Sequence, residues 1–278
     1  MGAIYALVAL GLLQIFSAVR IVNFAQGQLV MLGAFIGITT VVQAKLPYPI
    51  AWMLTFAAMS VIGFVFMLIA YFPLRGRPYY LVILTTIALG IVIENLALII
   101  WGPLPLGMPS PLSTEPLRFW GLSISRHVVL IFVVTAALLA AQHSFLTRTV
   151  FGRMMQATSQ DMEAARLIGI RTNRTISAAF MMGAVFAAAA GILVAPIFLA
   201  EPAMGGPLML KGFVVSVIGG FGSLPGAVIA GLLLGVIEAF AASYISSDFR
   251  DAYAFALMIA MLFARPQGIF GEKISERA

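Results

Sequence analysis

Residues 20–33 read RIVNFAQGQLVMLG, a short run in which four polar side chains interrupt an otherwise apolar sequence. Apolar residues continue on both sides of this run, from residue 2 to residue 43. A straight helix over that length would reach about 63 Å, about twice the ~30 Å hydrocarbon core of a bilayer. The quoted run is therefore predicted to be the turn between two membrane crossings.

The composition of the whole chain agrees with a membrane protein. Hydrophobic residues make up 62% of its 278 residues and charged residues 9%, against roughly 25% charged residues in soluble domains. The apolar stretches are continuous rather than alternating, which favours helices over a β-barrel. The chain has no cysteine, so it contains neither disulfides nor thiolate metal sites. Its net charge of +6 comes from basic residues between apolar spans, which orient a membrane protein, and no nucleic-acid partner is expected.

These features predict an all-α fold, a polytopic transmembrane helical bundle of about eight or nine spans, some of them broken or re-entrant. We expect residues 1–278 to form a single domain. The predicted spans are 2–19, 27–43, 49–72, 80–101, 127–146, 175–200, 209–222, 225–246 and 252–264.

The basic residues predict the orientation of these spans. With the N-terminus outside, eleven of the 16 Lys and Arg fall on one side and five on the other, so the side with eleven should be cytoplasmic. The eleven are Arg20, Arg75, Arg77, Arg148, Arg153, Arg166, Arg171, Arg174, Arg265, Lys273 and Arg277. The five are Lys45, Arg118, Arg126, Lys211 and Arg250.

Two loops are long enough to have a function. The outer loop, 102–126, contains five prolines, which exclude a regular helix and favour an extended cover. The inner loop, 147–174, is predicted to contain a short helix: Thr158 and Asp161 have capping-box spacing, and Gly169 ends the helix.

The apolar face of this short helix is formed by Met162, Ala165, Leu167 and Ile168. It is too short to cross a bilayer. Its residues alone leave two interpretations open: a surface helix lying on anionic lipid, or a contact for a soluble partner.

Three polar residues fall inside predicted spans. Glu94, with Asn95 beside it, and Glu238 each lie near the middle of a span, where a charge costs about 2.5 to 3.5 kcal/mol. Glu94 is either a structural hydrogen-bonding group or part of a pathway. For Glu238 we favour a structural role.

The quoted run is unusual for a free loop because it is partly apolar. A turn recessed into the bundle would need Asn23, Gln26 and Gln28 to satisfy backbone groups, and unwound backbone at depth lies against protein or a water-filled cavity. We therefore place the run on a translocation pathway; an ordinary inner turn is the alternative. The Gly-rich segment 219–226 is expected to form a tight turn or a broken helix. The pathway candidates are Asn23, Gln26, Gly27, Gln28, Glu94, Asn95, Gly219 and Gly220.

The sequence contains no Gly-x-x-x-x-Gly-Lys-Ser/Thr phosphate loop, so ATP hydrolysis by that motif is not expected of this chain. His127 and His143 have no second metal ligand beside them, which favours packing or interfacial roles. No trio of nucleophile, acid and base stands out. The chain is not expected to be an enzyme, and no cofactor is expected to bind to it.

Four segments together resemble one family, the permeases of bacterial branched-chain amino-acid ABC importers of the LivH type. GAIYALVALGL with RIVNFAQGQLVMLGAF is similar to its N-terminal signature, and EAARLIGIRTNR to its coupling-loop signature. LKGFVVSVIGGFGSLPGAVIAGLLLG and ARPQGIFG resemble the late Gly-rich and C-terminal signatures. One departure is clear: the family usually has NFAHGE where this chain has NFAQGQ at 23–28, so a role that needs ionisation there is not expected.

The resemblance implies that the short inner helix docks into a cleft of an ATPase subunit. The residues that it assigns to coupling are Asp161, Glu163, Ala164, Ala165, Arg166 and Gly169. It also implies a second related permease, two ATPase subunits that hold the ATP, and a periplasmic or lipid-anchored solute-binding protein, in the bacterial inner membrane. Amides and urea are substrates of close cousins. An ion-coupled secondary transporter, with Glu94 and Glu238 as relay groups, and a structural scaffold are the other classes considered.

Overall fold

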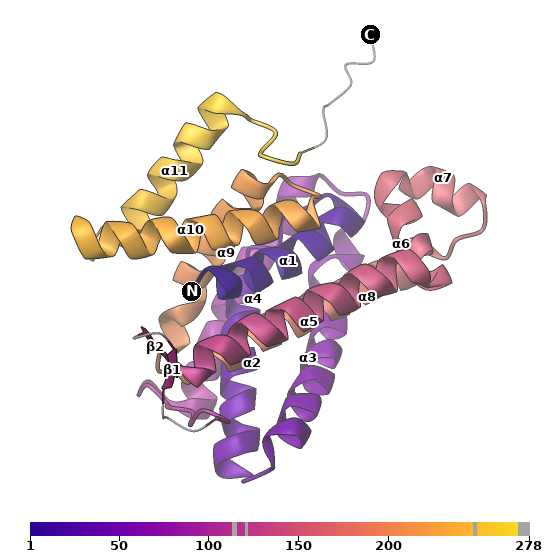
Figure 1. Ribbon diagram of the computed structural model, residues 1–278. Helices are drawn as coiled ribbons and strands as arrows, with labels where there is room; N and C mark the ends of the chain where they lie inside the picture. Colours follow the sequence, from indigo (N-terminus) through magenta and orange to yellow (C-terminus); the bar gives the residue numbers. More distant parts are fainter. Residues whose placement is uncertain (113–115, 120–121, 247–248, 272–278) are drawn as a thin grey trace.

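The computed structural model describes residues 1–112, 116–119, 122–246 and 249–271, and almost all of their regular structure is helical (Figure 1). The α-helices are α1 (Gly2–Val19), α2 (Gln26–Ile38), α3 (Tyr48–Ala70), α4 (Tyr79–Trp101), α5 (Arg126–Arg148), α6 (Val150–Gln160), α7 (Met162–Leu167), α8 (Thr172–Val194), α9 (Gly205–Gly219), α10 (Leu224–Tyr244) and α11 (Arg250–Ala264). The shorter elements are the π-helical turn η1 (Thr39–Gln43), the 3-10 turns η2 (Phe72–Leu74) and η3 (Pro202–Met204), and the antiparallel strands β1 (Leu117–Phe119) and β2 (Leu122–Ile124).

Eight helical segments in the described part are long and apolar enough to cross a membrane. They are α1, α2 with η1, α3 with η2, α4, α5, α8, η3 with α9, and α10. The ninth predicted span, 252–264, lies in α11, whose 15 residues make it shorter than the others. The predicted all-α polytopic bundle is confirmed.

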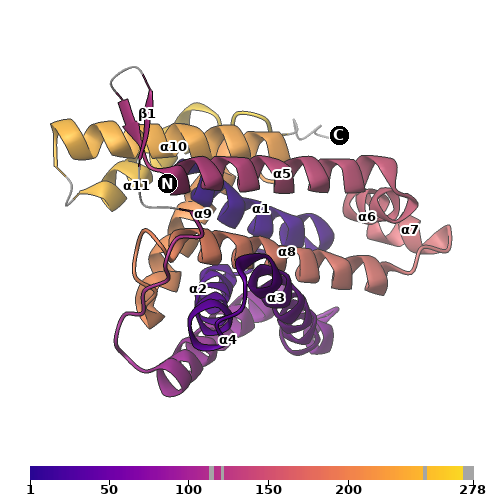
Figure 2. The same ribbon diagram turned by 60° about the horizontal axis from the view of Figure 1, so that its bottom comes forward.

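Helix α1 lies at the centre of the bundle. All but three of its residues are buried, and it packs against α8, α9 and α10. Figure 2 shows α2, α3 and α4 on one side of α8, and α5 and α10 on the other. Glycines bring α2 and α8 close together: a Cβ on Gly191 would lie 2.2 Å from the carbonyl oxygen of Val30. Small residues at helix contacts are typical of membrane bundles, because they allow the backbones to approach.

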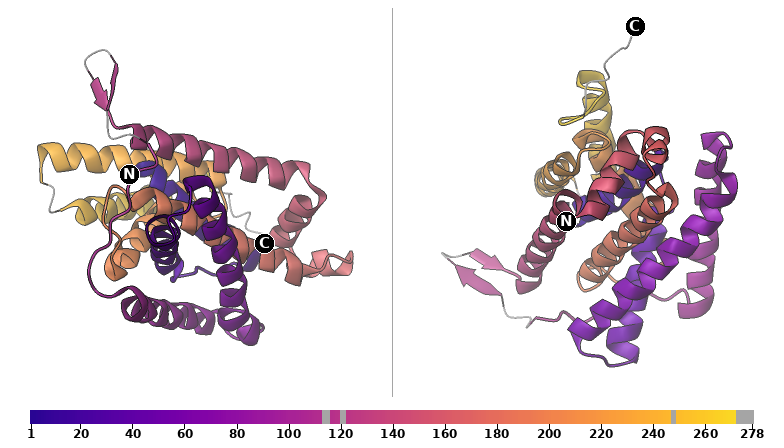
Figure 3. Two further views of the ribbon diagram at one scale, coloured as in Figure 1. Left: turned by 90° about the horizontal axis from the view of Figure 1, so that it is seen from below. Right: turned by 90° about the vertical axis from the view of Figure 1, so that its right-hand side faces the viewer.

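The bundle has two distinct ends. Helices α6 and α7 project from one end, and the β1–β2 hairpin lies at the other (Figures 1 and 3). Arg20 and the turn between α9 and α10 lie at the α6–α7 end, which we call the basic end. Two of the basic residues assigned to this side, Lys273 and Arg277, lie outside the described residues.

The outer loop packs against the end opposite the basic end. Leu106 and Ala200 exchange backbone hydrogen bonds of 2.9 and 2.8 Å, and the Tyr48 hydroxyl donates to the carbonyl oxygen of Pro109. His127 is buried and has the carbonyl oxygen of Leu193 2.9 Å from its Nε2 atom, which is the packing role expected for it. The described part of the loop contains no helix, as its prolines predict, and the β1–β2 pairing was not predicted.

Candidate functional site

The stretch between α1 and α2 is recessed into the bundle. Helix α2 begins beside the middle of α1 and α8. Two contacts of the Gln26 side chain show this: its amide donates to the carbonyl oxygen of Gly183 at 3.0 Å, and a Cβ on Gly11 would meet the same amide. The Ala25 N–H donates to the Asn23 side-chain oxygen at 3.1 Å. The predicted role of these amides in satisfying backbone groups is therefore confirmed for Asn23 and Gln26.

Burial separates the four pathway candidates of this stretch. Asn23 and Gln26 are 1% and 0% exposed, so neither side chain reaches the surface in this conformation. Gly27 is also buried, and its α-carbon lies so close to α9 that a Cβ would sit 1.9 Å from the carbonyl oxygen of Gly205. Gln28 alone is partly exposed, and its Oε1 atom has no hydrogen-bond partner in the described part of the chain.

Helix α4 lies beside Gln28 and carries the other polar candidates. The Phe24 N–H donates to the Thr86 hydroxyl at 3.2 Å, and Gly90 faces the Gln28 side chain. Glu94 follows one turn later, partly buried, and makes no hydrogen bond or ion pair with the described residues. Asn95 is exposed and donates to the carbonyl oxygen of Ile91 in its own helix. Gln28 and Glu94 thus lie along one side of the α2–α4 contact.

Gly219 ends α9, and Gly220 begins the tight turn that follows it at the basic end. Gly220 has a φ of +97°, which favours glycine, and both residues are buried. The segment after α11 covers them: the Ile269 N–H donates to Ile218 and the Phe270 N–H to Gly219. Of the two expected arrangements, the tight turn is the one present. It does not line an open surface.

The short inner helix forms, but its cap differs from the prediction. Thr158 is not the N-cap; it lies inside α6, where it donates to the carbonyl oxygen of Met154. Asp161 is the N-cap of α7, and its carboxylate accepts the N–H groups of Glu163 and Ala164 at 2.8 and 2.9 Å. Thr and Asp are both common N-cap residues. Here Thr158 is buried, and its hydroxyl accepts a hydrogen bond from the Thr175 hydroxyl at 3.1 Å.

The end of α7 and its exposed surface are well defined. Gly169 has a φ of +86°, and the Ile170 N–H donates to the carbonyl oxygen of Ala165, so Gly169 ends the helix as predicted. The predicted apolar face is divided. Ala165 is buried, whereas Leu167 and Ile168 are 86% and 76% exposed.

Hydrogen bonds fix the α6–α7 unit to the bundle. Arg20, the first residue after α1, donates to the carbonyl oxygen of Ser159 at 2.8 Å. Arg166 donates to the Thr172 hydroxyl at 3.1 Å at the start of α8, while Glu163 and Ala164 remain exposed. The unit is therefore connected both to α8 and to the recessed stretch.

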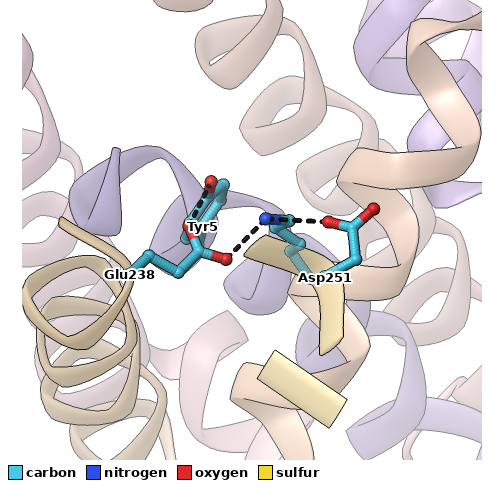
Figure 4. Close-up of polar contacts among 4 residues, drawn as sticks. Tyr5, Glu238 and Asp251 are labelled. Atoms are coloured by element: carbon cyan, nitrogen blue, oxygen red, sulfur yellow. Dashed lines mark hydrogen bonds and ion pairs between the residues drawn. The ribbon is translucent and has the colours of Figure 1, made fainter. Parts of the chain in front are cut away.

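A charged cluster near the end opposite the basic end was not predicted. Lys211 on α9 donates to Glu238 on α10 and forms an ion pair with Asp251 on α11, with a nitrogen–oxygen distance of 3.1 Å. The Tyr5 hydroxyl donates to the second oxygen of Glu238 at 2.8 Å (Figure 4). This arrangement agrees with the structural role favoured for Glu238. The sequence signal for this cluster was Lys211, a lysine inside an apolar segment. In the sequence analysis Lys211 was used only to predict the orientation of the spans.

Comparison with known proteins identifies a family whose sequences match this chain. The family described as "Branched-chain amino acid transport system / permease component" matches residues 1–262. The permease protein BraD of a high-affinity branched-chain amino acid transport system from Pseudomonas aeruginosa is 33% identical, covering 99% of this chain and 94% of the relative. The LivH permease proteins of Salmonella typhimurium and Escherichia coli are 30% and 29% identical, each over 100% of this chain and 94% of the relative.

No solved structure matches the chain. The family match covers far more than half of the sequence, and the relatives align along nearly all of it. The apolar helices agree with the multi-pass membrane proteins of this family. The chain therefore belongs to the permease-component family of branched-chain amino acid transport systems.

Proposed function

We propose that this chain is the transmembrane permease subunit of an ATP-driven importer of branched-chain amino acids in the bacterial inner membrane. Residues 1–278 form one permease unit. It works with a second related permease, two ATPase subunits that bind and hydrolyse ATP, and a periplasmic or lipid-anchored solute-binding protein. The basic end faces the cytoplasm, in agreement with the excess of positive charge on that side.

The observation that carries this proposal is the pair of exposed apolar side chains at the end of α7, on its last residue, Leu167, and on the C-cap, Ile168. Leu167 and Ile168 project from a short helix that is capped at Asp161, stopped at Gly169 and bonded to the bundle. A surface helix lying on lipid needs no such bracing. A rigid apolar projection is suited to a cleft in a soluble partner, where its burial contributes to binding. Asp161, Glu163, Ala164, Ala165, Arg166 and Gly169 form and flank this contact.

Movement of the docked unit has a direct connection to the recessed stretch. Arg20 bonds to the last turn of α6, and three residues later Asn23 begins the buried turn. A displacement of α6 and α7 by the ATPase would therefore pull on the segment that begins α2. We assign the coupling of ATP binding to pathway opening to this connection, with Asn23, Gln26 and Gly27 holding the turn and Gly219 and Gly220 closing the bundle nearby.

The substrate route follows the α2–α4 side of the chain. Gln28, Glu94 and Asn95 place polar groups on or near the exposed face of α4, where contact with lipid would cost about 2.5 to 3.5 kcal/mol for the charge. Cover by the second permease, or by water between the two permeases, removes this cost. The route therefore runs along the contact between the two permeases.

A test replaces the projecting side chains of α7. Leu167→Asp and Ile168→Asp should abolish copurification of the ATPase subunits and uptake of leucine, while the chain stays inserted. Val150→Asp is the matched control, because Val150 is a 64% exposed apolar residue of α6 outside the docking helix. Normal ATPase association in both α7 variants would contradict the docking proposal. Equal loss in the control would assign the effect to charge at this surface in general.

A further inference from the structure

A large cavity lies near the end of the molecule opposite the basic end. Its volume is about 820 Å³, and it is bordered by α1, the segment after α8, α9, α10 and the start of α11. Exposed side chains such as Phe198, at 45%, and Asp251, with 67% of its side chain accessible, line it, so it reaches the surface. Nothing in the proposed coupling or pathway uses this space.

One wall of the cavity carries the charged cluster. Lys211 and Glu238 are 9% and 5% exposed as whole residues, and their side chains are 11% and 7% accessible, so both groups lie largely inside the protein. Ionisable residues inside membrane helices are costly and are therefore functional candidates by default. Figure 4 shows Tyr5, Glu238 and Asp251 arranged around the ammonium group. Tyr5 and Lys211 together occupy both oxygens of Glu238, which fixes that carboxylate.

The charged cluster has both a cationic and an anionic group that can still bind a ligand. An ammonium group has three N–H donors; Lys211 donates one hydrogen bond, to Glu238, and forms an ion pair with Asp251. The ion pair joins Lys211 to the Oδ1 atom of Asp251, and the other oxygen has no hydrogen bond or ion pair in the described part of the chain. Arg250 lines the same cavity and donates no hydrogen bond within the described ranges, and exposed Glu201 is a second carboxylate-bearing residue of the lining beside Asp251.

The rest of the lining is apolar. Val194, Phe198 and Leu208 are among the residues that complete the wall. Binding sites for small molecules combine such apolar surface with a few polar groups that fix the orientation of the ligand. Here the polar groups include both cations and carboxylates within one cavity, which suits a ligand that has a positive and a negative group close together and an aliphatic remainder.

We propose that this cavity binds a free, zwitterionic α-amino acid with an aliphatic side chain on the side of the membrane opposite the ATPase. Lys211 and Arg250 hold the carboxylate of the ligand, Asp251 and Glu201 hold its ammonium group, and the apolar wall holds its side chain. The Lys211–Glu238 pair stays intact and positions the Lys211 ammonium. This assignment rests on the proposed function, and it adds to the importer an amino-acid site that is separate from the α2–α4 route.

The test is direct binding of radiolabelled L-leucine to the full chain in nanodiscs. Arg250→Gln and Asp251→Asn each remove one charge and leave the buried pair in place. Each should weaken leucine binding about tenfold or more, the effect expected for losing one hydrogen bond to a charged group. Lys45→Gln is the control, a cation outside the cavity lining whose loss should leave affinity unchanged.

Analogues of leucine test the requirement for two charges. Unlabelled leucine should displace the label, whereas 3-methylbutylamine, without a carboxylate, and 4-methylpentanoate, without an ammonium group, should not at the same concentration. If either analogue displaces the label as effectively as leucine does, the zwitterion assignment is overturned. Absence of saturable binding, or equal binding by all variants with unchanged gel-filtration profiles, would overturn the site and leave the cluster as a brace between helices.

Failure of this inference can be told apart from failure of the proposed function. ATP-driven leucine uptake at wild-type rates by the complete transporter carrying Asp251→Asn, together with no leucine binding to the chain, would remove the site and keep the function. The opposite pattern, in which leucine is not transported but another aliphatic amino acid binds with the same dependence on Arg250 and Asp251, would keep the site and remove the proposed substrate.

Discussion

Substitution of alanine for Gly27 tests the close contact between the starts of α2 and α9. A Cβ at position 27 would lie 1.9 Å from the carbonyl oxygen of Gly205 and 2.7 Å from the Met209 Cβ. Ordinary contact begins at 3.4 Å, so the two helices would have to separate by about 1.5 Å at this point. The oxygen and carbon of the Gly205 carbonyl are backbone atoms, so they cannot rotate away from the new Cβ.

The two physical effects of Gly27→Ala have opposite signs. Helix propensity alone would stabilise α2 by up to about 1 kcal/mol, whereas overpacking costs typically about 1 to 3 kcal/mol. Because the contact is far inside the van der Waals limit, we expect overpacking to prevail, with a net loss of about 1 to 2 kcal/mol and reduced transport. Thermal unfolding followed by gel filtration, with uptake measured in parallel, gives both quantities.

Gly206→Ala is the matched control for this experiment. Gly206 lies in the first turn of α9, next to Gly205, and a Cβ there would meet nothing within 4 Å. Its alanine variant should be as stable as the original chain or slightly more so. If Gly27→Ala is also unchanged in stability and transport, the close approach of α2 and α9 is refuted.

Three further outcomes follow from the site geometry. Asp161→Ala should cost the local helix about 1 kcal/mol and weaken ATPase copurification, while Asp161→Asn should retain both; equal behaviour would contradict the N-cap assignment. Glu94→Gln should preserve assembly with the second permease better than Glu94→Leu, because an amide still forms a hydrogen bond across a subunit contact; equal loss of transport with normal assembly would instead require the carboxylate itself in the route. Single cysteines at Gln28 should react with a water-soluble thiol reagent, whereas cysteines at Asn23 and Gln26 should stay protected until ATP changes the conformation; rapid reaction at the latter two without nucleotide would contradict their burial.

Continuous apolar length was sufficient to predict most of the bundle. Helices α3, α4 and α5 begin and end within two residues of the predicted limits because lipid requires a long apolar helix and the flanking residues break it. The recessed turn was predictable as well, since 2–43 is too long for one crossing and polar side chains occur where unwound backbone needs partners. The shift of the N-cap from Thr158 to Asp161 was not predictable, because both residue types cap helices. The tertiary contact of Thr158 with Thr175 accompanies the use of Asp161 as the cap.

The charged cluster could not be derived from spacing. Lys211, Glu238 and Asp251 lie on three different helices, and helices that are apolar around most of their circumference give no periodic signal for which face meets which neighbour. For the same reason, the sequence did not separate buried Asn23 and Gln26 from partly exposed Gln28. Relative rotation of packed helices is set by tertiary contacts such as Gly27 against Gly205, which are not periodic in one chain.

The most direct test of the account is leucine uptake by proteoliposomes that contain this chain copurified with its partner subunits, with the solute-binding protein outside and nucleotide inside. ATP in the lumen should drive leucine accumulation, vanadate or a non-hydrolysable analogue should stop it, and a protonophore should leave it unchanged. Leucine accumulation that needs no ATP and collapses when the protonophore is added would contradict the account and identify an ion-coupled transporter.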